Sequence, residues 1–230
     1  MIMNFTSLIH PDGWKFFGLS TILTLFLYTM NTTVGHLGLV ITCWVFYFFR
    51  NPKRMTPVRS GLVISPADGK IVGIKEMVPP EEFDMPQVPH YRVSIFLNVF
   101  DVHINRIPMS GTVKNILYTP GRFINASLDK ASDFNERNTI VMSTSHGDIA
   151  FTQIAGLIAR RIRCDISDGD EVEIGLQYGL IRFGSRMDVY FPKTSALLVS
   201  VGQRMIAGET VLADFDSNES DREAICVEAF

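Results

Sequence analysis

Two uncharged apolar runs near the N-terminus place the strongest constraint on how this chain folds. Phe16–Met30 and Val34–Phe49 contain no Asp, Glu, Lys or Arg and are rich in Leu, Phe, Ile and Val. Each run is shorter than the roughly 20 residues that a bilayer span needs. The presence of two apolar runs also distinguishes this segment from a signal peptide, which has one apolar region before a cleavage site. The runs therefore predict a pair of apolar helices.

Basic residues lie at both outer ends of this pair, while the connection between the runs carries no charge. Lys15 precedes the first run, and Arg50, Lys53 and Arg54 follow the second. The positive-inside bias then predicts that both ends face the cytoplasm. We expect residues 1–54 to form a membrane-anchoring hydrophobic hairpin with a basic flank, at the cell membrane, with the remaining domain on the cytoplasmic side. A pair of buried core helices is the alternative.

The chain changes to Pro, Gly and short alternating segments after Arg54. Apolar residues recur with period 2 at Val93–Val99, Val172–Leu180 and Met187–Phe191, which is typical of strands with one buried face. One helix is predicted at Thr152–Arg163. Residues 55–230 are therefore expected to form a mainly β domain, sandwich-like or barrel-like, with few helices. Cys43, Cys164 and Cys226 are far apart, which predicts no disulfide framework and no zinc site.

The pair Gly184-Ser185 interrupts one of the strand-like stretches. A glycine inside a strand by itself most often marks a bulge or a close backbone approach. The pair also allows a reaction, because a serine oxygen can attack the preceding carbonyl when glycine leaves that carbonyl uncrowded. The resulting ester can eliminate to dehydroalanine, which hydrolyses to a pyruvoyl group and ammonia. Such an attack requires a base to activate the hydroxyl.

Few residues can act as that base. Of the five histidines, His103 alone directly follows an apolar strand outside the anchor region and away from the polar loops. A histidine at such a place is most often structural. Asp68 is followed by Gly69, and Asp-Gly is first of all a turn signal.

Four segments in order resemble the successive motifs of phosphatidylserine decarboxylases of the short prokaryotic type. They are Ser65-Pro66-Ala67-Asp68-Gly69, Phe100-Asp101-Val102-His103-Ile104-Asn105-Arg106-Ile107-Pro108, Asn135-Glu136-Arg137-Asn138 and Arg182-Phe183-Gly184-Ser185-Arg186. The resemblance extends from about Arg50 to about Asp214. One such motif is a weak signal, whereas four in order are specific.

The resemblance implies a zymogen that cuts itself into residues 1–184 and 185–230. It implies a covalent pyruvoyl cofactor derived from Ser185, without a metal or pyridoxal phosphate. Asp68, His103 and Ser185 would act together, with Asp68 orienting the His103 imidazole and His103 removing the serine proton. The activity would convert phosphatidylserine to phosphatidylethanolamine. A homo-oligomer is compatible with the resemblance, and no nucleic acid is expected as a partner.

This chain departs from the longer members of the family at three positions. Those members carry a second histidine where this chain has Arg106, and Leu and Thr where it has Phe183 and Arg186. Short members share these differences. Arg106, Arg122 and Arg137 are the candidates to contact the phosphodiester or the carboxylate of the lipid, since a guanidinium pairs well with oxyanions.

Two other classes of protein remain open from the residues alone. One is a membrane-anchored serine hydrolase that uses Ser185, His103 and Asp68 without self-cleavage, although Gly184-Ser185 lacks the Gly-x-Ser-x-Gly elbow. The other is a non-catalytic β scaffold. Both predict one intact chain, whereas the decarboxylase hypothesis predicts that the chain is cut into two pieces.

Overall fold

The computed structural model describes residues 8–124, 126, 134–156, 162–182, 184–222, 224 and 225. The chain divides into two compact units. One unit contains both helices and takes in Val99–Val102, and the other contains Arg54–Asn98 and the chain from His103 onward. The change of unit between Lys53 and Arg54 coincides with the change of sequence texture.

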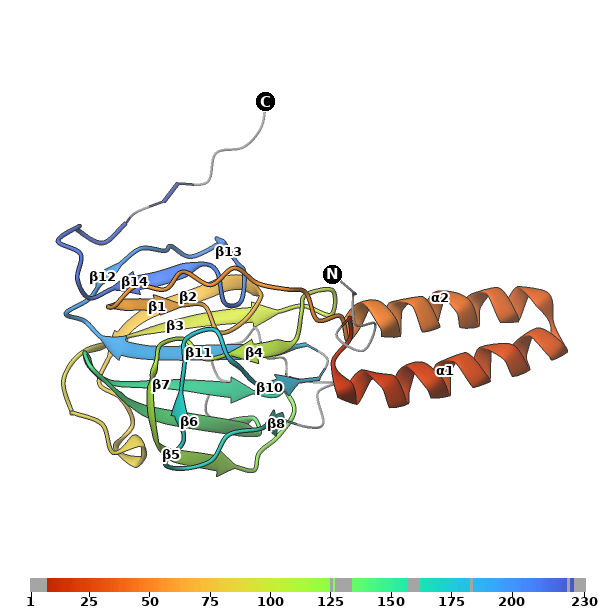
Figure 1. The fold of residues 1–230 in the computed structure, drawn as a ribbon, viewed down its shortest axis with the longest axis horizontal. Coiled ribbons are helices and arrows are strands. Elements are labelled where there is room, and N and C mark those ends of the chain that lie inside the picture. Colours follow the sequence, from red (N-terminus) through yellow and green to blue (C-terminus); the bar gives the residue numbers. More distant parts are fainter. Residues whose placement is uncertain are drawn as a thin grey trace. The chain divides into compact units, whose positions relative to one another are not determined.

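The helical unit consists of α1 (Pro11–Met30) and α2 (Thr32–Phe48), which lie side by side in Figure 1. Proline at the first position suits a helix start, because its missing N–H would have no partner there. Asn31 alone separates the helices. Its backbone N–H donates to Leu27 O at the end of α1, and its side-chain oxygen accepts from Thr33 N (2.8 Å) at the start of α2.

The two helices pack through small polar and aromatic groups and leave large apolar groups outside. The hydroxyls of Thr24 and Thr42 are buried and 2.9 Å apart, and the rings of Phe16 and Phe49 stack. More than half of the side-chain surface is exposed at Leu19, Ile22, Leu25, Phe26, Met30, Leu37, Val40 and Ile41. Among the described residues, no helix combines the length and the hydropathy required to cross a membrane.

The second unit is built from antiparallel strands, so the prediction of a mainly β fold with few helices is confirmed. Its largest sheet has the strand order β13-β2-β3-β11-β7-β6-β5-β9 and curls on itself (Figure 1). These strands are β13 (Arg204–Met205), β2 (Gly69–Met77), β3 (His90–Leu97), β11 (Ser185–Pro192), β7 (Gly147–Ile154), β6 (Arg137–Thr144), β5 (Gly111–Thr119) and β9 (Glu171–Val172). A short 3₁₀ helix, η2 (Glu81–Phe83), lies between β2 and β3.

Two three-stranded sheets complete this unit. One has the order β1-β14-β12, formed by β1 (Leu62–Ile64), β14 (Val211–Asp214) and β12 (Ala196–Leu197). The other has the order β4-β10-β8, formed by β4 (Ile104–Arg106), β10 (Gln177–Ile181) and β8 (Ile162–Cys164). The chain passes from this last sheet into the large one between β10 and β11.

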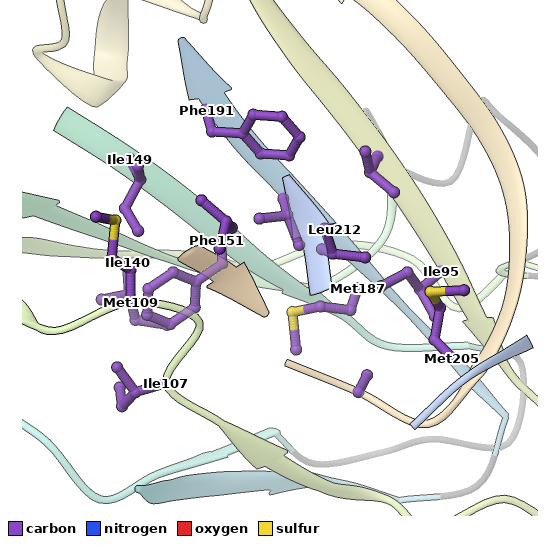
Figure 2. Close-up of a cluster of buried hydrophobic side chains, with 14 of the residues drawn as sticks. Ile95, Ile107, Met109, Ile140, Ile149, Phe151, Met187, Phe191, Met205 and Leu212 are labelled. Carbon is purple, nitrogen blue, oxygen red and sulfur yellow. The ribbon is translucent and has the colours of Figure 1, made fainter. Parts of the chain in front are cut away.

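The core of the β unit lies between the large sheet and the smaller ones. Figure 2 shows side chains from β3, β6, β7 and β11 in one buried cluster with Met205 of β13 and Leu212 of β14. On β11, Met187, Val189 and Phe191 are fully buried, as their period of 2 predicts. The side chains between them point to the other face of the strand.

The helix predicted at Thr152–Arg163 is wrong where the structure describes it. Thr152–Ile154 continue β7, and Ile162 and Arg163 belong to β8. β7 is hydrogen-bonded to β6 on one side and to β11 on the other. This pairing with distant segments outweighs the local helical spacing of apolar residues.

Candidate active site

Gly184 and Ser185 lie where the chain enters β11 from the neighbouring sheet. Ser185 is the first residue of β11 and pairs with Leu97 of β3. Gly184 has a φ of +62°, in the left-handed region that favours glycine. The Ser185 side chain is fully buried, and its Oγ has no hydrogen-bond partner among the residues that the structure describes. Buried hydroxyls normally have a partner, so this oxygen is a candidate reactive group.

His103 lies directly against this peptide bond. It is fully buried and immediately precedes β4, which pairs with β10. Its backbone oxygen accepts from Ile181 N (3.3 Å), and its Nε2 accepts from Gly184 N (3.3 Å). A ring nitrogen that accepts a hydrogen bond carries no proton. The Nε2 lone pair therefore lies beside the Gly184-Ser185 pair, where it accepts the Gly184 N–H and must be released before it can act as a general base.

The hydrogen bonds of Asp68 go to Arg54 and Ala207. Its two carboxylate oxygens accept from Arg54 Nη2 at 2.9 and 2.7 Å, and Oδ1 also accepts from Ala207 N at 2.7 Å. Both side chains of this ion pair are largely buried. The structure therefore brings Ser185 and His103 together and places Asp68 in an ion pair with Arg54.

The three arginines predicted to bind substrate lie in different surroundings. Arg106 donates from Nη1 to Gly175 O (2.9 Å), and burial, followed by the charge of Arg54, lowers its pKa. Arg122 is exposed in the segment after β5. Arg137 donates to Glu82 (3.4 Å) and lines a cavity of about 410 Å³.

That cavity lies on the face of β11 that points away from the core. Asp188 and Tyr190 of β11 line it, together with Arg92 and Arg137. Successive side chains alternate between the two faces of a strand, so this cavity and the Ser185 side chain lie on opposite faces of β11.

A buried ion pair immediately follows Ser185 and was missed by the sequence reasoning. Arg186 and Asp188 are 1% and 0% exposed, with Nε and Oδ1 2.8 Å apart and Nη2 donating to Oδ2 at 2.8 Å. Arg186 Nη1 also donates to Ala126 O (3.5 Å). Charged residues two apart in a strand share a face, so the alternation Arg186-Met187-Asp188 was the available signal.

A chain of buried amides joins two of the sequence motifs. Asn138 Nδ2 donates to Gln153 Oε1 (3.1 Å), and Gln153 Nε2 donates to Asn105 Oδ1 (2.9 Å). These contacts link β6, β7 and β4. Since β4 directly follows His103, the amide chain helps to fix the position of that histidine.

The described arrangement is suited to an intramolecular attack by serine. The hydroxyl is buried and unpartnered, the preceding residue has no side chain, and an unprotonated imidazole nitrogen is hydrogen-bonded to that residue. The residues thus fit a pyruvoyl group derived from Ser185. Within the described part of the chain, no three His, Cys, Asp or Glu side chains gather as metal ligands would.

Fold and site together define a mainly β protein with the groups for serine-driven self-processing. A sequence model described as phosphatidylserine decarboxylase matches residues 41–213. The chain is 53% identical over 216 residues to the phosphatidylserine decarboxylase proenzyme of Paramagnetospirillum magneticum, covering 94% of this chain and 90% of that protein. It is also 53% identical over 209 residues to the proenzymes of Rickettsia akari and Rickettsia felis, covering 90% of each chain. The chain belongs to the phosphatidylserine decarboxylase family.

Proposed function

We propose that this chain is a proenzyme that cuts itself between Gly184 and Ser185 and then decarboxylates phosphatidylserine through a pyruvoyl group made from Ser185. Its relatives are named phosphatidylserine decarboxylase proenzymes. The observation that carries the proposal is the buried Ser185 Oγ, which has no hydrogen-bond partner among the described residues and follows a glycine whose N–H is bonded to His103.

The first step is an acyl shift from nitrogen to oxygen. His103 Nε2 takes the hydroxyl proton as Ser185 Oγ attacks the Gly184 carbonyl carbon. The carbon–nitrogen bond then breaks, and the proton passes to the released Ser185 amine. The product is an ester between Gly184 and the Ser185 side chain, with no atoms gained or lost.

The second step removes the ester. A base takes the Cα proton of Ser185, and the Gly184 carboxylate leaves with the electron pair of its bond to the side chain. Residue 185 becomes dehydroalanine, and water hydrolyses it to a pyruvoyl group with release of ammonia. The chains 1–184 and 185–230 result.

The pyruvoyl group, when present, supplies the electron sink for loss of carbon dioxide from the serine headgroup. This chain's own contribution is to hold and protonate the substrate. His103 is proposed to return a proton to the headgroup carbon. Asp68 is proposed to support the charge of His103, and Arg106 and Arg122 to meet the lipid's phosphodiester or carboxylate, whereas Arg137 lines the cavity on the other face of β11.

We further infer that the helical unit attaches the enzyme to the cytoplasmic side of the cell membrane. The support is the large exposed apolar surface on both helices, which monomeric soluble proteins rarely present. An enzyme attached there acts on its lipid without extracting it. Flotation with phosphatidylserine-containing vesicles tests this inference, and replacing Ile22 and Val40 by Asp should reduce recovery in the floating fraction.

Intact-mass spectrometry of the purified full-length protein tests self-cleavage directly. We expect two chains that divide after Gly184, the smaller one blocked to N-terminal sequencing, with release of carbon dioxide from phosphatidylserine vesicles. One uncut chain of 25.8 kDa would instead support the serine hydrolase or the β scaffold.

Ser185→Ala should remain uncut and inactive. Ser195→Ala is the matched control, because Ser195 is also buried and lies in the same C-terminal piece, but its Oγ donates to Pro192 O. The control protein should be cut like the wild type. Decarboxylation by uncut Ser185→Ala would refute the proposed function.

A further inference from the structure

Gly156 lies against the carbonyl group that self-cleavage must attack. A Cβ atom added to Gly156 would be 1.8 Å from the Gly184 oxygen and 2.9 Å from the Gly184 carbonyl carbon. Both distances are far below van der Waals contact. The Gly156 backbone is outside the left-handed region, so an alanine would be acceptable there by conformation alone. Among the described residues, the Gly184 carbonyl is the main obstacle to a side chain at position 156, and the Ala126 Cβ, at 3.3 Å, is a lesser one.

The backbone that carries Gly156 is fixed on its N-terminal side. Ile154, the last residue of β7, pairs with Arg186 of β11 and with Arg137 of β6. The next residue, Ala155, donates from its N–H to Glu136 O (2.9 Å). Gly156 therefore continues a segment that is already attached to the strand beginning at Ser185.

Asn135 supplies a second attachment. It is fully buried, and its Nδ2 donates to Ala155 O (2.7 Å) and to Ile124 O (2.8 Å), while its Oδ1 accepts from Ile124 N (3.0 Å). One amide side chain thus pairs with three backbone groups. It belongs to the motif Asn135-Glu136-Arg137-Asn138. The reaction steps described above give Asn135 no role.

We propose that Gly156 is a positioning residue for self-cleavage, and that Asn135 acts through Ala155 to hold it in place. The absent side chain at position 156 lets the Gly184 carbonyl oxygen lie against the Ala155–Gly156 backbone. This contact fixes the direction of the carbonyl and so the face that it presents to Ser185 Oγ. The inference rests on the proposed function, because it concerns the same bond.

A methyl group at position 156 must displace the Gly184 carbonyl or the segment 155–156. Gly184 begins the connection into β11 and has a glycine's freedom, so we expect the carbonyl to turn while the fold persists. Attack within a protein depends steeply on alignment, and a misplacement of about 1 Å can lower a rate roughly 100-fold. Gly156→Ala should therefore cleave itself roughly 100-fold more slowly than the wild type.

The experiment follows conversion of newly made full-length chain into two pieces over time on denaturing gels. Gly73→Ala is the matched control, since an added Cβ at Gly73 of β2 meets nothing within 4 Å and its φ is outside the left-handed region. It should mature at the wild-type rate. Equal slowing of Gly73→Ala, or normal maturation of Gly156→Ala, would overturn the inference.

Two further measurements separate positioning from folding. In the uncleavable Ser185→Ala background, adding Gly156→Ala should leave a cooperative thermal transition close to that of the parent. Asn135→Asp, which keeps its shape but loses the two N–H donors, should also slow maturation, and normal maturation of this variant would remove Asn135 from the inference.

Hydroxylamine identifies the step. It cleaves esters, so a chain stalled after the acyl shift is split by it, whereas a chain stalled before the shift is not. We expect Gly156→Ala to resist hydroxylamine, and rapid splitting would contradict a role in attack. If the wild type stays uncut, the proposed function is wrong. If the wild type cuts itself and Gly156→Ala does so at the same rate, only the inference about Gly156 is wrong.

Discussion

Among single residues, His103 has the contact that bears most directly on the chemistry. Its Nε2 is bonded to the N–H of the residue just before Ser185, at 3.3 Å. That bond selects the tautomer in which Nε2 is free of a proton. The nitrogen is thus in its basic form, and it can take the serine proton once the Gly184 N–H no longer occupies its lone pair.

His103→Ala should cut itself about 10²-fold to 10⁴-fold more slowly, the usual contribution of a positioned general base. The rate of appearance of the two chains measures this. His146→Ala serves as the control, since His146 lies in a surface turn and contacts Ser145 and Asp216. Normal maturation of His103→Ala would assign the base to another group.

The ion pair between Arg54 and Asp68 allows the role of Asp68 to be tested. If Asp68 serves only to fix the local fold, Arg54→Ala and Asp68→Asn should slow maturation to a similar extent, because each breaks the same pair. If its charge supports His103, Asp68→Asn should mature much more slowly than Arg54→Ala. We expect the second result, with both unfolding free energies measured in the Ser185→Ala background for comparison.

The sequence motifs predicted that Ser185 and His103 act together, and the structure places His103 against Gly184, but the motifs did not predict the surroundings of these residues. The partner of Asp68 was missed because Arg54 follows an apolar run and was interpreted as a membrane flank. Gly156 has no recognisable signal in the sequence, since its importance comes from a contact with Gly184 that exists only after β7 and β11 have paired.

Among the elements, β11 is the one on which the site depends. It is hydrogen-bonded to β3 along one edge and to β7 along the other, and the core covers one of its faces. Its buried apolar residues could be predicted from their alternation. The extension of β7 through Ile154 could not, because the apolar residues there also fit a helix and only distant pairing decides between the two.

Removing one partner of the buried ion pair on β11 should be strongly destabilising. Asp188→Asn leaves Arg186 buried without its counter-charge, and breaking such a pair costs about 3–5 kcal/mol. Urea denaturation in the Ser185→Ala background measures the loss. Glu76→Gln is the control, since the Glu76–Lys193 pair is exposed and should change stability by less than about 1 kcal/mol.

The segment after β14 is attached to β3 by a contact that depends on pH. Tyr91 OH donates to Asp221 Oδ2 (2.5 Å), and Leu197 N donates to Oδ1 (3.0 Å). Burial and the bond to Asp221 raise the pKa of Tyr91 to about 12, and the bond from Tyr91 lowers the pKa of Asp221.

Each pKa shift sets one limit of the pH range in which this attachment stabilises the folded state. A lowered carboxyl pKa stabilises the folded state above the unfolded pKa, and that contribution disappears as the pH falls through the lowered value. A raised tyrosine pKa stabilises the folded state below about pH 10, and that contribution is lost as the pH rises through about 12. Protection of the Leu197 amide from hydrogen exchange, relative to its intrinsic rate at each pH, should therefore be greatest between these limits. Asp221→Asn should lower the pKa of Tyr91, as followed by ultraviolet titration, and an unchanged pKa would assign the whole shift to burial.

For the whole molecule, self-cleavage divides the chain without dividing the sheet. The smaller piece begins with β11 and also contains β12, β13 and β14, so its strands pair with β1, β2, β3 and β7 of the larger piece. The two pieces should elute together in size-exclusion chromatography in detergent and separate only in denaturant. Their separation under native conditions would contradict the described pairing.

The place of Ser185 at the head of β11 also determines how often the enzyme can make its cofactor. The reaction consumes a peptide bond that exists once in each polypeptide, and the sheet afterwards holds both ends where they were. Mixing separately made pieces could rebuild the strands but would not recreate that bond. Under the proposed function, a molecule whose pyruvoyl group is destroyed would be permanently inactive, and the cell could restore activity only by new synthesis.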